Sequence, residues 1–139
     1  MMAGTTEAFT QALYVDASLV LEGGYERREP TRGATRVDGL RLLYAGAVNG
    51  LVGDPETGKT LIATAIAAEG LARGESVLWI DVDHNGPAAT LARLRRFGVP
   101  KATLTDPALF RLAVPDEQSA VLHVVAEAEL WQPALAVVV

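Results

Sequence analysis

The segment Gly53–Thr60, with the sequence Gly-Asp-Pro-Glu-Thr-Gly-Lys-Thr, contains residue types at a spacing that binds phosphate. It fits the pattern G-x-x-x-x-G-K-[ST] at every fixed position. The two glycines of such a loop let its backbone N–H groups turn inward toward phosphate oxygens. The segment therefore predicts a site for ATP or ADP together with Mg²⁺.

Each part of this predicted nucleotide site has a chemical role. Lys59 is expected to reach the β- and γ-phosphates, which makes it a catalytic candidate, and the Thr60 hydroxyl is expected to bind Mg²⁺. The N-terminus of the helix that follows adds the positive end of its dipole. The predicted cofactor-binding residues are Gly53, Asp54, Pro55, Glu56, Thr57, Gly58, Lys59, Thr60 and Leu61.

Two carboxylates form a second group of candidate residues. Asp81 and Asp83 stand at the end of the apolar run that begins at Ser76. In open α/β sheets the ligand binds beyond the carboxyl ends of the strands, which is the end that carries these aspartates. We expect one of them to orient water or Mg²⁺; the alternative is that they cap a helix or a turn. His84 is either a contact of the γ-phosphate or an exposed turn residue.

The elements around the loop follow from local sequence signals. An apolar segment at 47–52 predicts a buried strand before the loop. The following residues predict a helix over 58–73, with Gly74 as its left-handed stop. Apolar residues at helical spacing predict the core face of that helix. These residues are Leu61, Ile62, Ala65, Ile66 and Ala68 or Ala72.

The rest of the chain alternates predicted strands and helices. A continuous apolar run predicts a buried parallel strand over 76–83. Pro87 predicts a helix start, and Gly98 a stop after Phe97, with Ala88, Leu91, Leu94 and Phe97 inward. Further elements are expected at 109–112 (strand), 119–131 (helix) and 134–139 (strand). The pattern predicts an α/β fold, a three-layer sandwich with a parallel sheet, over 39–139.

Residues 1–38 are predicted to form an N-terminal extension or linker, with a short helix at 8–13 and an exposed charged stretch at 26–33. The whole chain of 139 residues is long enough for one small domain with a core. No apolar run approaches the roughly 20 residues that span a bilayer, and no secretory signal is present. These features predict a cytoplasmic protein without a membrane partner. The net charge of −5 disfavours a broad nucleic-acid-binding face.

From about Leu42 to Val139 the order of elements, with Asp81-Val82-Asp83-His84 after a strand, resembles the RecA-like ATPases. It is most similar to the bacterial and phage AAA-type group with RepA-like hexameric helicases. In that family the strand typically ends in Asp-x-Glu, whose Glu activates the attacking water. By position that catalytic role falls on Asp83, which is one methylene shorter and implies weak hydrolysis.

The resemblance also implies that the strand at 134–139 ends in the Walker B Asp, which would come directly after Val139. One further strand would then separate 47–52 from 134–139. The chain is thus expected to be the N-terminal portion of a RecA-like core that is incomplete at its C-terminus. The implied function is an ATP-binding module that couples hydrolysis to DNA replication or recombination, as a homo-oligomeric hexameric ring on DNA in its full-length form.

Two other functions are compatible with the same loop. One is a nucleotide-binding switch or scaffold with little hydrolysis, or a truncated inactive ATPase fragment. The other is a small P-loop kinase, although no arginine-rich lid follows Lys59. DNA-stimulated hydrolysis would distinguish the helicase-like ATPase from the switch.

Overall fold

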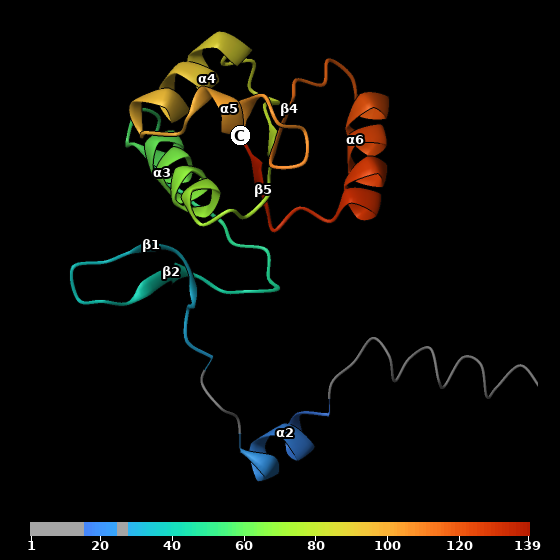
Figure 1. Cartoon of the computed structure of the whole chain (residues 1–139). Helices are drawn as coiled ribbons and strands as arrows, with labels where there is room; N and C mark the ends of the chain where they lie inside the picture. The colour runs from blue at the N-terminus through green and yellow to red at the C-terminus, as the bar shows by residue number, and fades with distance from the viewer. Residues whose placement is uncertain (1–15, 25–27) are drawn as a thin grey trace, which may run out of the picture.

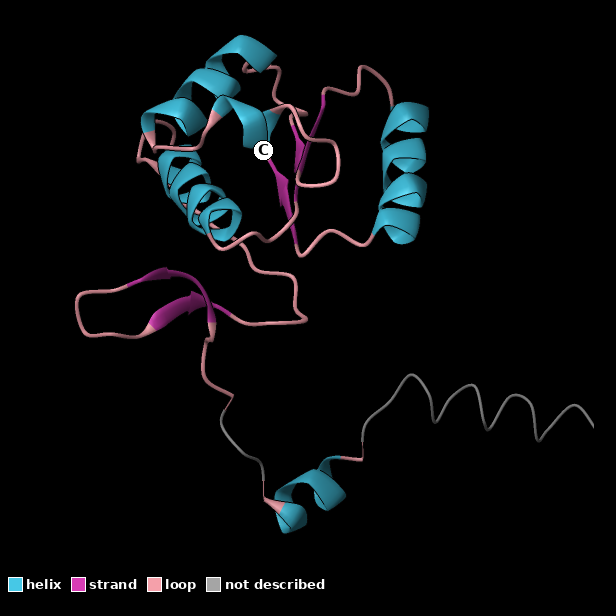
Figure 2. Ribbon diagram, viewed as in Figure 1, coloured by secondary structure: helices cyan, strands magenta, loops and turns pink. Residues whose placement is uncertain are grey.

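A three-stranded parallel sheet forms the centre of the protein in the computed structural model, which describes residues 16–24 and 28–139. The helix expected at 8–13 lies outside these described residues. The strands are β3 (Val77–Ile80), β4 (Phe110–Ala113) and β5 (Leu135–Val138), in the order β4-β3-β5 (Figure 2). The predicted α/β fold with a parallel sheet is therefore confirmed.

Strand β3 is the middle of this sheet, and all four of its residues are buried. Its register places Val77 beside Phe110 of β4 and beside Leu135 of β5. A strand that is paired on both sides and covered on both faces has no polar face, which explains its continuous apolar sequence.

Helices lie on both sides of the sheet (Figure 1). Helices α3 (Lys59–Ala72) and α4 (Pro87–Arg96) pack on one face, where Ala67 and Leu94 join Val77 and Trp79 in the core. Helix α6 (Gln118–Trp131) lies on the other face, toward Leu78. A short helix without a sequence prediction, α5 (Lys101–Leu104), leads from α4 to β4.

Helix α6 contacts the sheet through a cation–π interaction. The Arg111 guanidinium of β4 lies 4.2 Å from the centroid of the Trp131 ring. A cavity of about 200 Å³ remains between β4 and α6, lined in part by these two side chains and Glu127. This side of the sheet is consequently packed less closely than the side that carries α3 and α4.

The N-terminal part contains the helix α2 (Ala17–Gly23), which begins after the N-cap Asp16. It also contains two antiparallel strands, β1 (Arg32–Thr35) and β2 (Arg41–Leu43). The predicted boundary between 38 and 39 falls in the turn of this hairpin. Within the described ranges no helix has the length and hydropathy needed to span a bilayer.

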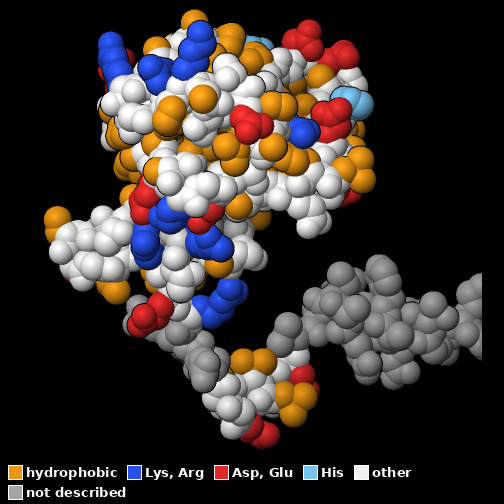
Figure 3. Space-filling model, viewed as in Figure 1, with side chains coloured by type: hydrophobic (Ala, Val, Ile, Leu, Met, Phe, Trp, Pro, Cys, Tyr) orange, Lys and Arg blue, Asp and Glu red, His pale blue; other side chains and the backbone are white. Residues whose placement is uncertain are grey.

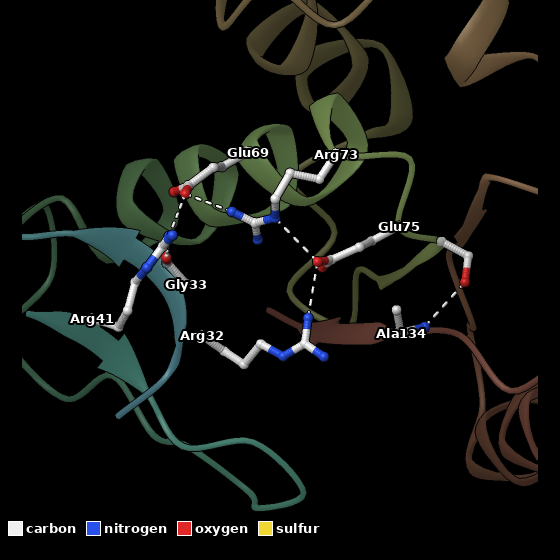
Figure 4. A network of polar contacts seen from close by, with 8 residues as sticks. Arg32, Gly33, Arg41, Glu69, Arg73, Glu75 and Ala134 are labelled. Atoms are coloured by element: carbon white, nitrogen blue, oxygen red, sulfur yellow. Dashed lines mark hydrogen bonds and ion pairs between the residues drawn. The ribbon is translucent and has the colours of Figure 1, made fainter. Parts of the chain in front are cut away.

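An ion-pair network joins the hairpin to α3 (Figure 4). Glu69 accepts hydrogen bonds of 2.6 Å from Arg41 and from Arg73. Glu75 accepts from Arg32 at 2.9 Å and from Arg73 at 3.1 Å. Partial burial raises the pKa of Glu69, but the hydrogen bonds and charges of the two arginines outweigh it and hold the pKa below its ordinary value. The network holds the hairpin against α3, the helix that follows the loop Gly53–Thr60.

The strand predicted at 47–52 does not form. These residues have no regular secondary structure, and Val48 and Val52 are 104% and 98% exposed. The side chain of Asn49 braces the start of the segment through hydrogen bonds with the backbone of Tyr44 and Ala47. An apolar segment becomes a strand only when a neighbouring strand takes its backbone hydrogen bonds, and no described strand lies beside this one.

The predicted helix over 58–73 is confirmed as α3, and Gly74 ends it with a φ of +79°. Its predicted core face is partly wrong, because Leu61 and Ile62 are exposed. The buried face is instead made by Ala63, Thr64, Ile66, Ala67, Ala68, Gly70 and Leu71. The first turn lacks cover because the preceding segment is not part of the sheet.

The predicted helix over 87–97 is confirmed as α4, with Pro87 in its first turn. Its predicted inward face is also partly wrong. Leu94 is fully buried and Leu91 partly so, but Ala88 is exposed and Phe97 is 46% exposed. Phe97 is the C-cap of α4 and has turned out of the helix face that meets the core.

Candidate nucleotide-binding site

The predicted phosphate loop, Gly53–Thr60, ends at the uncapped N-terminus of α3. Gly58 is the N-cap residue, with a left-handed φ of +90°, and it provides no side-chain hydrogen bond. The first N–H groups of a helix have no partner within the helix. At α3 these groups, with the positive end of the helix dipole, are therefore available to an anion.

Gly53 is required by close packing within the loop. A Cβ atom at this position would lie 2.9 Å from Oγ1 of Thr57. That hydroxyl donates a 2.7 Å hydrogen bond to the carbonyl of Asp54, which closes the loop on itself. A side chain at Gly53 would open this turn, so the structure explains the first glycine of the motif.

Lys59 folds back over the loop. Its ammonium group donates to the carbonyl oxygens of Gly53 and Asp54, the latter at 2.8 Å. Among the described residues it forms no salt bridge with a carboxylate. Two neutral carbonyls are weaker partners for this ammonium than a phosphate, because a phosphate adds the attraction between opposite charges.

Glu56 is a strained residue at the tip of the loop. Its φ of +62° is left-handed, which costs a non-glycine residue about 1–2 kcal/mol. Asp54 and Glu56 are both exposed, so the loop carries two carboxylates and a single ammonium. Strained backbone of this kind concentrates at functional sites. Glu56 thus combines a left-handed backbone with an exposed carboxylate inside the predicted phosphate loop.

Asp81 has the structural role that was the alternative to catalysis. It is fully buried, and its two carboxylate oxygens accept from the backbone N–H groups of Asn85 and Gly86, at 3.2 and 3.1 Å. The side-chain amide of Asn85 adds a third, longer contact of 3.4 Å. These bonds shape the turn from β3 into α4 and occupy the carboxylate.

Asp83 is the exposed carboxylate at this end of the sheet. Its backbone N–H donates to the carbonyl of Val139 at 3.1 Å, which ties the turn to the end of β5. The next residue, His84, has a left-handed φ of +53° and is also exposed. Of the two aspartates, Asp83 is thus the one whose side chain is available to a ligand.

The topology brings the phosphate loop and Asp83 to the same end of the domain. Helix α3 and strand β3 run in opposite directions because only a short turn at Gly74 joins them. The start of α3 therefore lies at the level of the carboxyl end of β3. The candidate residues therefore lie at one end of the domain. The structural role of Asp81 was the alternative that the sequence offered, whereas no sequence signal indicated the positive φ of Glu56.

Comparison with known proteins gives no family assignment. No protein-family model matches the chain. A search of the curated proteins also finds no match. The function must accordingly be argued from the geometry of the site.

Proposed function

We propose that this protein binds ATP and ADP, with Mg²⁺, at Gly53–Leu61. The observation that carries the proposal is the closed loop on an uncapped helix N-terminus, with the Lys59 ammonium held over it by two backbone carbonyls of the loop. A Cβ atom at Gly53 would lie 2.9 Å from Oγ1 of Thr57, so glycine at this position leaves the closed turn undisturbed. Backbone donors, the helix dipole and the Lys59 ammonium all favour the same anionic group.

Each part of the proposed site would have its own role in binding phosphate, Mg²⁺ or water. Backbone N–H groups of the loop and of the first turn of α3 hold the β- and γ-phosphates. Lys59 exchanges its carbonyl partners for phosphate oxygens, and the Thr60 hydroxyl contributes to holding Mg²⁺. When bound, Mg²⁺ neutralises charge on the phosphates. Asp83 accepts a hydrogen bond from the attacking water and so orients it.

The proposal extends to a RecA-like ATPase of the helicase type. Its support is the sequence resemblance together with a parallel sheet that has helices on both faces; the strand order beside the loop adds none, because 47–52 is not a strand. In its longer form such a protein would couple ATP hydrolysis to movement on DNA as a homo-oligomeric ring. A nucleotide-dependent switch with little hydrolysis is the second candidate, favoured by the short side chain of Asp83 and the internal use of Asp81.

Titration calorimetry with Mg-ATP tests the binding proposal. Lys59→Ala removes charge-assisted hydrogen bonds worth about 1.5–3 kcal/mol, so affinity should fall about 10- to 150-fold. Lys101→Ala is the matched control, since it removes an exposed lysine outside the loop. Equal affinity of the Lys59→Ala variant and the wild type would refute the site.

Hydrolysis assays separate the two candidate functions. Asp83→Asn should leave Mg-ATP affinity within about twofold, because the residue is outside the loop. For an ATPase the same substitution should lower turnover by about 10²–10⁴-fold, the usual contribution of a general base. Turnover that is near background and insensitive both to Asp83→Asn and to DNA would favour the switch.

A further inference from the structure

The cavity between β4 and α6 combines an apolar wall with two opposite charges. Its volume is about 200 Å³, and its apolar wall includes Leu78, Leu112, Val124 and Ala128. Arg111, Glu127 and Trp131 also line it, and a more open hollow of about 310 Å³ shares these three residues. In Figure 3, basic, acidic and hydrophobic side chains lie next to one another on the α6 side of the domain. We call this site the β4–α6 cavity.

The guanidinium of Arg111 has hydrogen-bond donors to spare. It lies over the Trp131 ring, 4.2 Å from the ring centroid, and its Nε donates a 2.9 Å hydrogen bond to the carbonyl of Pro107. Among the described residues its two terminal nitrogens have no acceptor, and no carboxylate lies within salt-bridge distance. Because the ring contact and the Nε bond hold the group in place, its terminal N–H groups form a preorganised fork for a carboxylate.

Glu127 carries the opposite charge in the same cavity. It does not form a salt bridge with Arg111, and its ion-pair partner within the described ranges is His123, at 3.5 Å, which is charged only when it is protonated. A cation and an anion that line one cavity without pairing favour a ligand with the reverse charges. Such a ligand would bring a carboxylate to Arg111 and an ammonium to Glu127.

We propose that the β4–α6 cavity binds a free α-amino acid with an apolar aliphatic side chain, for which L-leucine is the test ligand. Its carboxylate would accept hydrogen bonds from Arg111, its ammonium would donate to Glu127, and its side chain would pack against the apolar wall. An apolar cavity of about 150 Å³ holds a benzene molecule. A volume of about 200 Å³ is therefore sufficient for the side chain of leucine, with the two charged groups at the mouth.

Ligands with a single charge fit this cavity less well. An apolar carboxylate would leave Glu127 next to a second anion, and an apolar amine would leave Arg111 next to a second cation. The cavity lies on the face of the sheet that carries α6, whereas the loop Gly53–Thr60 leads into α3 on the other face (Figure 1). Amino-acid binding therefore stands or falls independently of nucleotide binding.

A chemical-shift titration by NMR of the isotopically labelled 139-residue chain, without nucleotide, is the first test. L-leucine should bind with a dissociation constant between about 50 μM and 1 mM, the range expected of so small a ligand. The amides of β4 and α6 and the indole N–H of Trp131 should shift. The indole N–H of Trp79, which is buried on the other face, should not. No saturable shift with leucine up to about 10 mM would overturn the proposal.

Three further ligands test which parts of leucine are recognised. Isocaproate is leucine without the ammonium, and isoamylamine is leucine without the carboxylate. Each should bind about tenfold or more weakly than leucine, because each loses charge-assisted hydrogen bonds. Glycine keeps both charges but lacks the apolar side chain, so it should bind about 100-fold more weakly. Isocaproate or isoamylamine that binds as tightly as leucine would contradict the paired charges.

Substitutions assign each charge to its residue. Glu127→Gln should weaken leucine about tenfold or more, yet it should leave isocaproate no weaker, because isocaproate has no ammonium. Arg111→Gln should weaken leucine by a similar factor and leave isoamylamine no weaker. Ala128→Leu fills the cavity with a good helix former and should abolish leucine binding.

Glu129→Gln is the matched control, since it removes the same charge from an exposed residue of α6 outside the cavity lining. Its affinity for leucine should stay within about twofold of the wild type. Far-UV circular dichroism of each variant verifies the fold. Unchanged leucine affinity in Glu127→Gln and Ala128→Leu would refute the site, whatever the fold of Arg111→Gln. Leucine-dependent shifts confined to residues outside β4 and α6 would place the ligand elsewhere and would also overturn the proposal.

Discussion

Strand β3 and the segment Ala47–Val52 are both short and apolar, yet β3 is buried in the sheet and the segment is mainly exposed. All of β3 is buried and paired on both sides. In the segment, Val48 and Val52 are fully exposed and no strand forms. Apolar composition is thus not what separates the two regions.

The difference lies in what surrounds each backbone. Around β3, the N–H of Val77 donates to Leu109 at 2.8 Å and the carbonyl of Ile80 accepts from Val139 at 3.0 Å. Ala47–Val52 is braced mainly by the side chain of Asn49. Strand β3 is paired on both sides and anchors the core. Because 47–52 is unpaired, the loop Gly53–Thr60 is connected to the core mainly through α3.

Amide hydrogen exchange should show the largest contrast between these regions. Amides of β3 should exchange only through global unfolding, which costs about 5–15 kcal/mol in a small domain. Amides of 47–52 should exchange at close to the rate of an unfolded peptide. Mass spectrometry of peptides from the two regions measures both. Equal protection of the amides in both regions would mean that 47–52 is hydrogen-bonded in solution, which would refute the difference in pairing.

Trp79→Ala should be the most destabilising single substitution in β3. Removal of a fully buried tryptophan costs about 3–5 kcal/mol. We expect the lower part of this range, because the buried indole N–H of Trp79 has no hydrogen-bond partner and its removal offsets part of the loss. Urea denaturation measures the change. Val48→Ala is the control in the exposed segment and should change the free energy of unfolding by less than about 0.5 kcal/mol.

Glu56→Gly should tighten nucleotide binding. It relieves a left-handed backbone and removes a carboxylate from the loop that is proposed to bind the phosphates. We expect Mg-ATP affinity to rise about threefold to tenfold by calorimetry, which corresponds to about 1 kcal/mol. Glu56→Gln removes only the charge, so it separates the two causes. Weaker binding by both variants would mean that the carboxylate assists the ligand.

Glu69→Gln should have the smallest effect. Ion pairs that are partly open to solvent contribute at most about 1 kcal/mol, so the free energy of unfolding at pH 7 should fall by less than that. The folded pKa of Glu69 lies below its ordinary value of 4.5. Its contribution is therefore complete above pH 4.5 and is lost as pH falls through the folded pKa.

Denaturation as a function of pH measures this contribution. The wild type should lose more stability than Glu69→Gln on acidification below pH 4.5, so the two curves should converge. Glu22→Gln, at an exposed glutamate without a salt bridge among the described residues, should leave the acid dependence unchanged. Parallel curves for wild type and Glu69→Gln would show that the network does not hold the hairpin to α3.

The sequence by itself determined the parts that depend on a few neighbouring residues. Gly74 and Gly98 end α3 and α4 with positive φ, and Pro87 begins α4. Glycine and proline act through their own backbone geometry, so these boundaries follow without knowledge of the fold. The loop Gly53–Thr60 was also located from the spacing of its residues alone, and its binding of phosphate stays a prediction.

Only the tertiary structure decided the features that depend on distant residues. The burial of Leu61, Ile62 and the segment 47–52 depends on which strand lies beside them, and none of the described strands does. The carboxylate of Asp81 accepts hydrogen bonds within the protein because the turn into α4 places two backbone N–H groups against it, whereas the side chain of Asp83 is exposed. Short-range rules predict where elements begin and end, but burial and hydrogen-bond partners are properties of the packed chain.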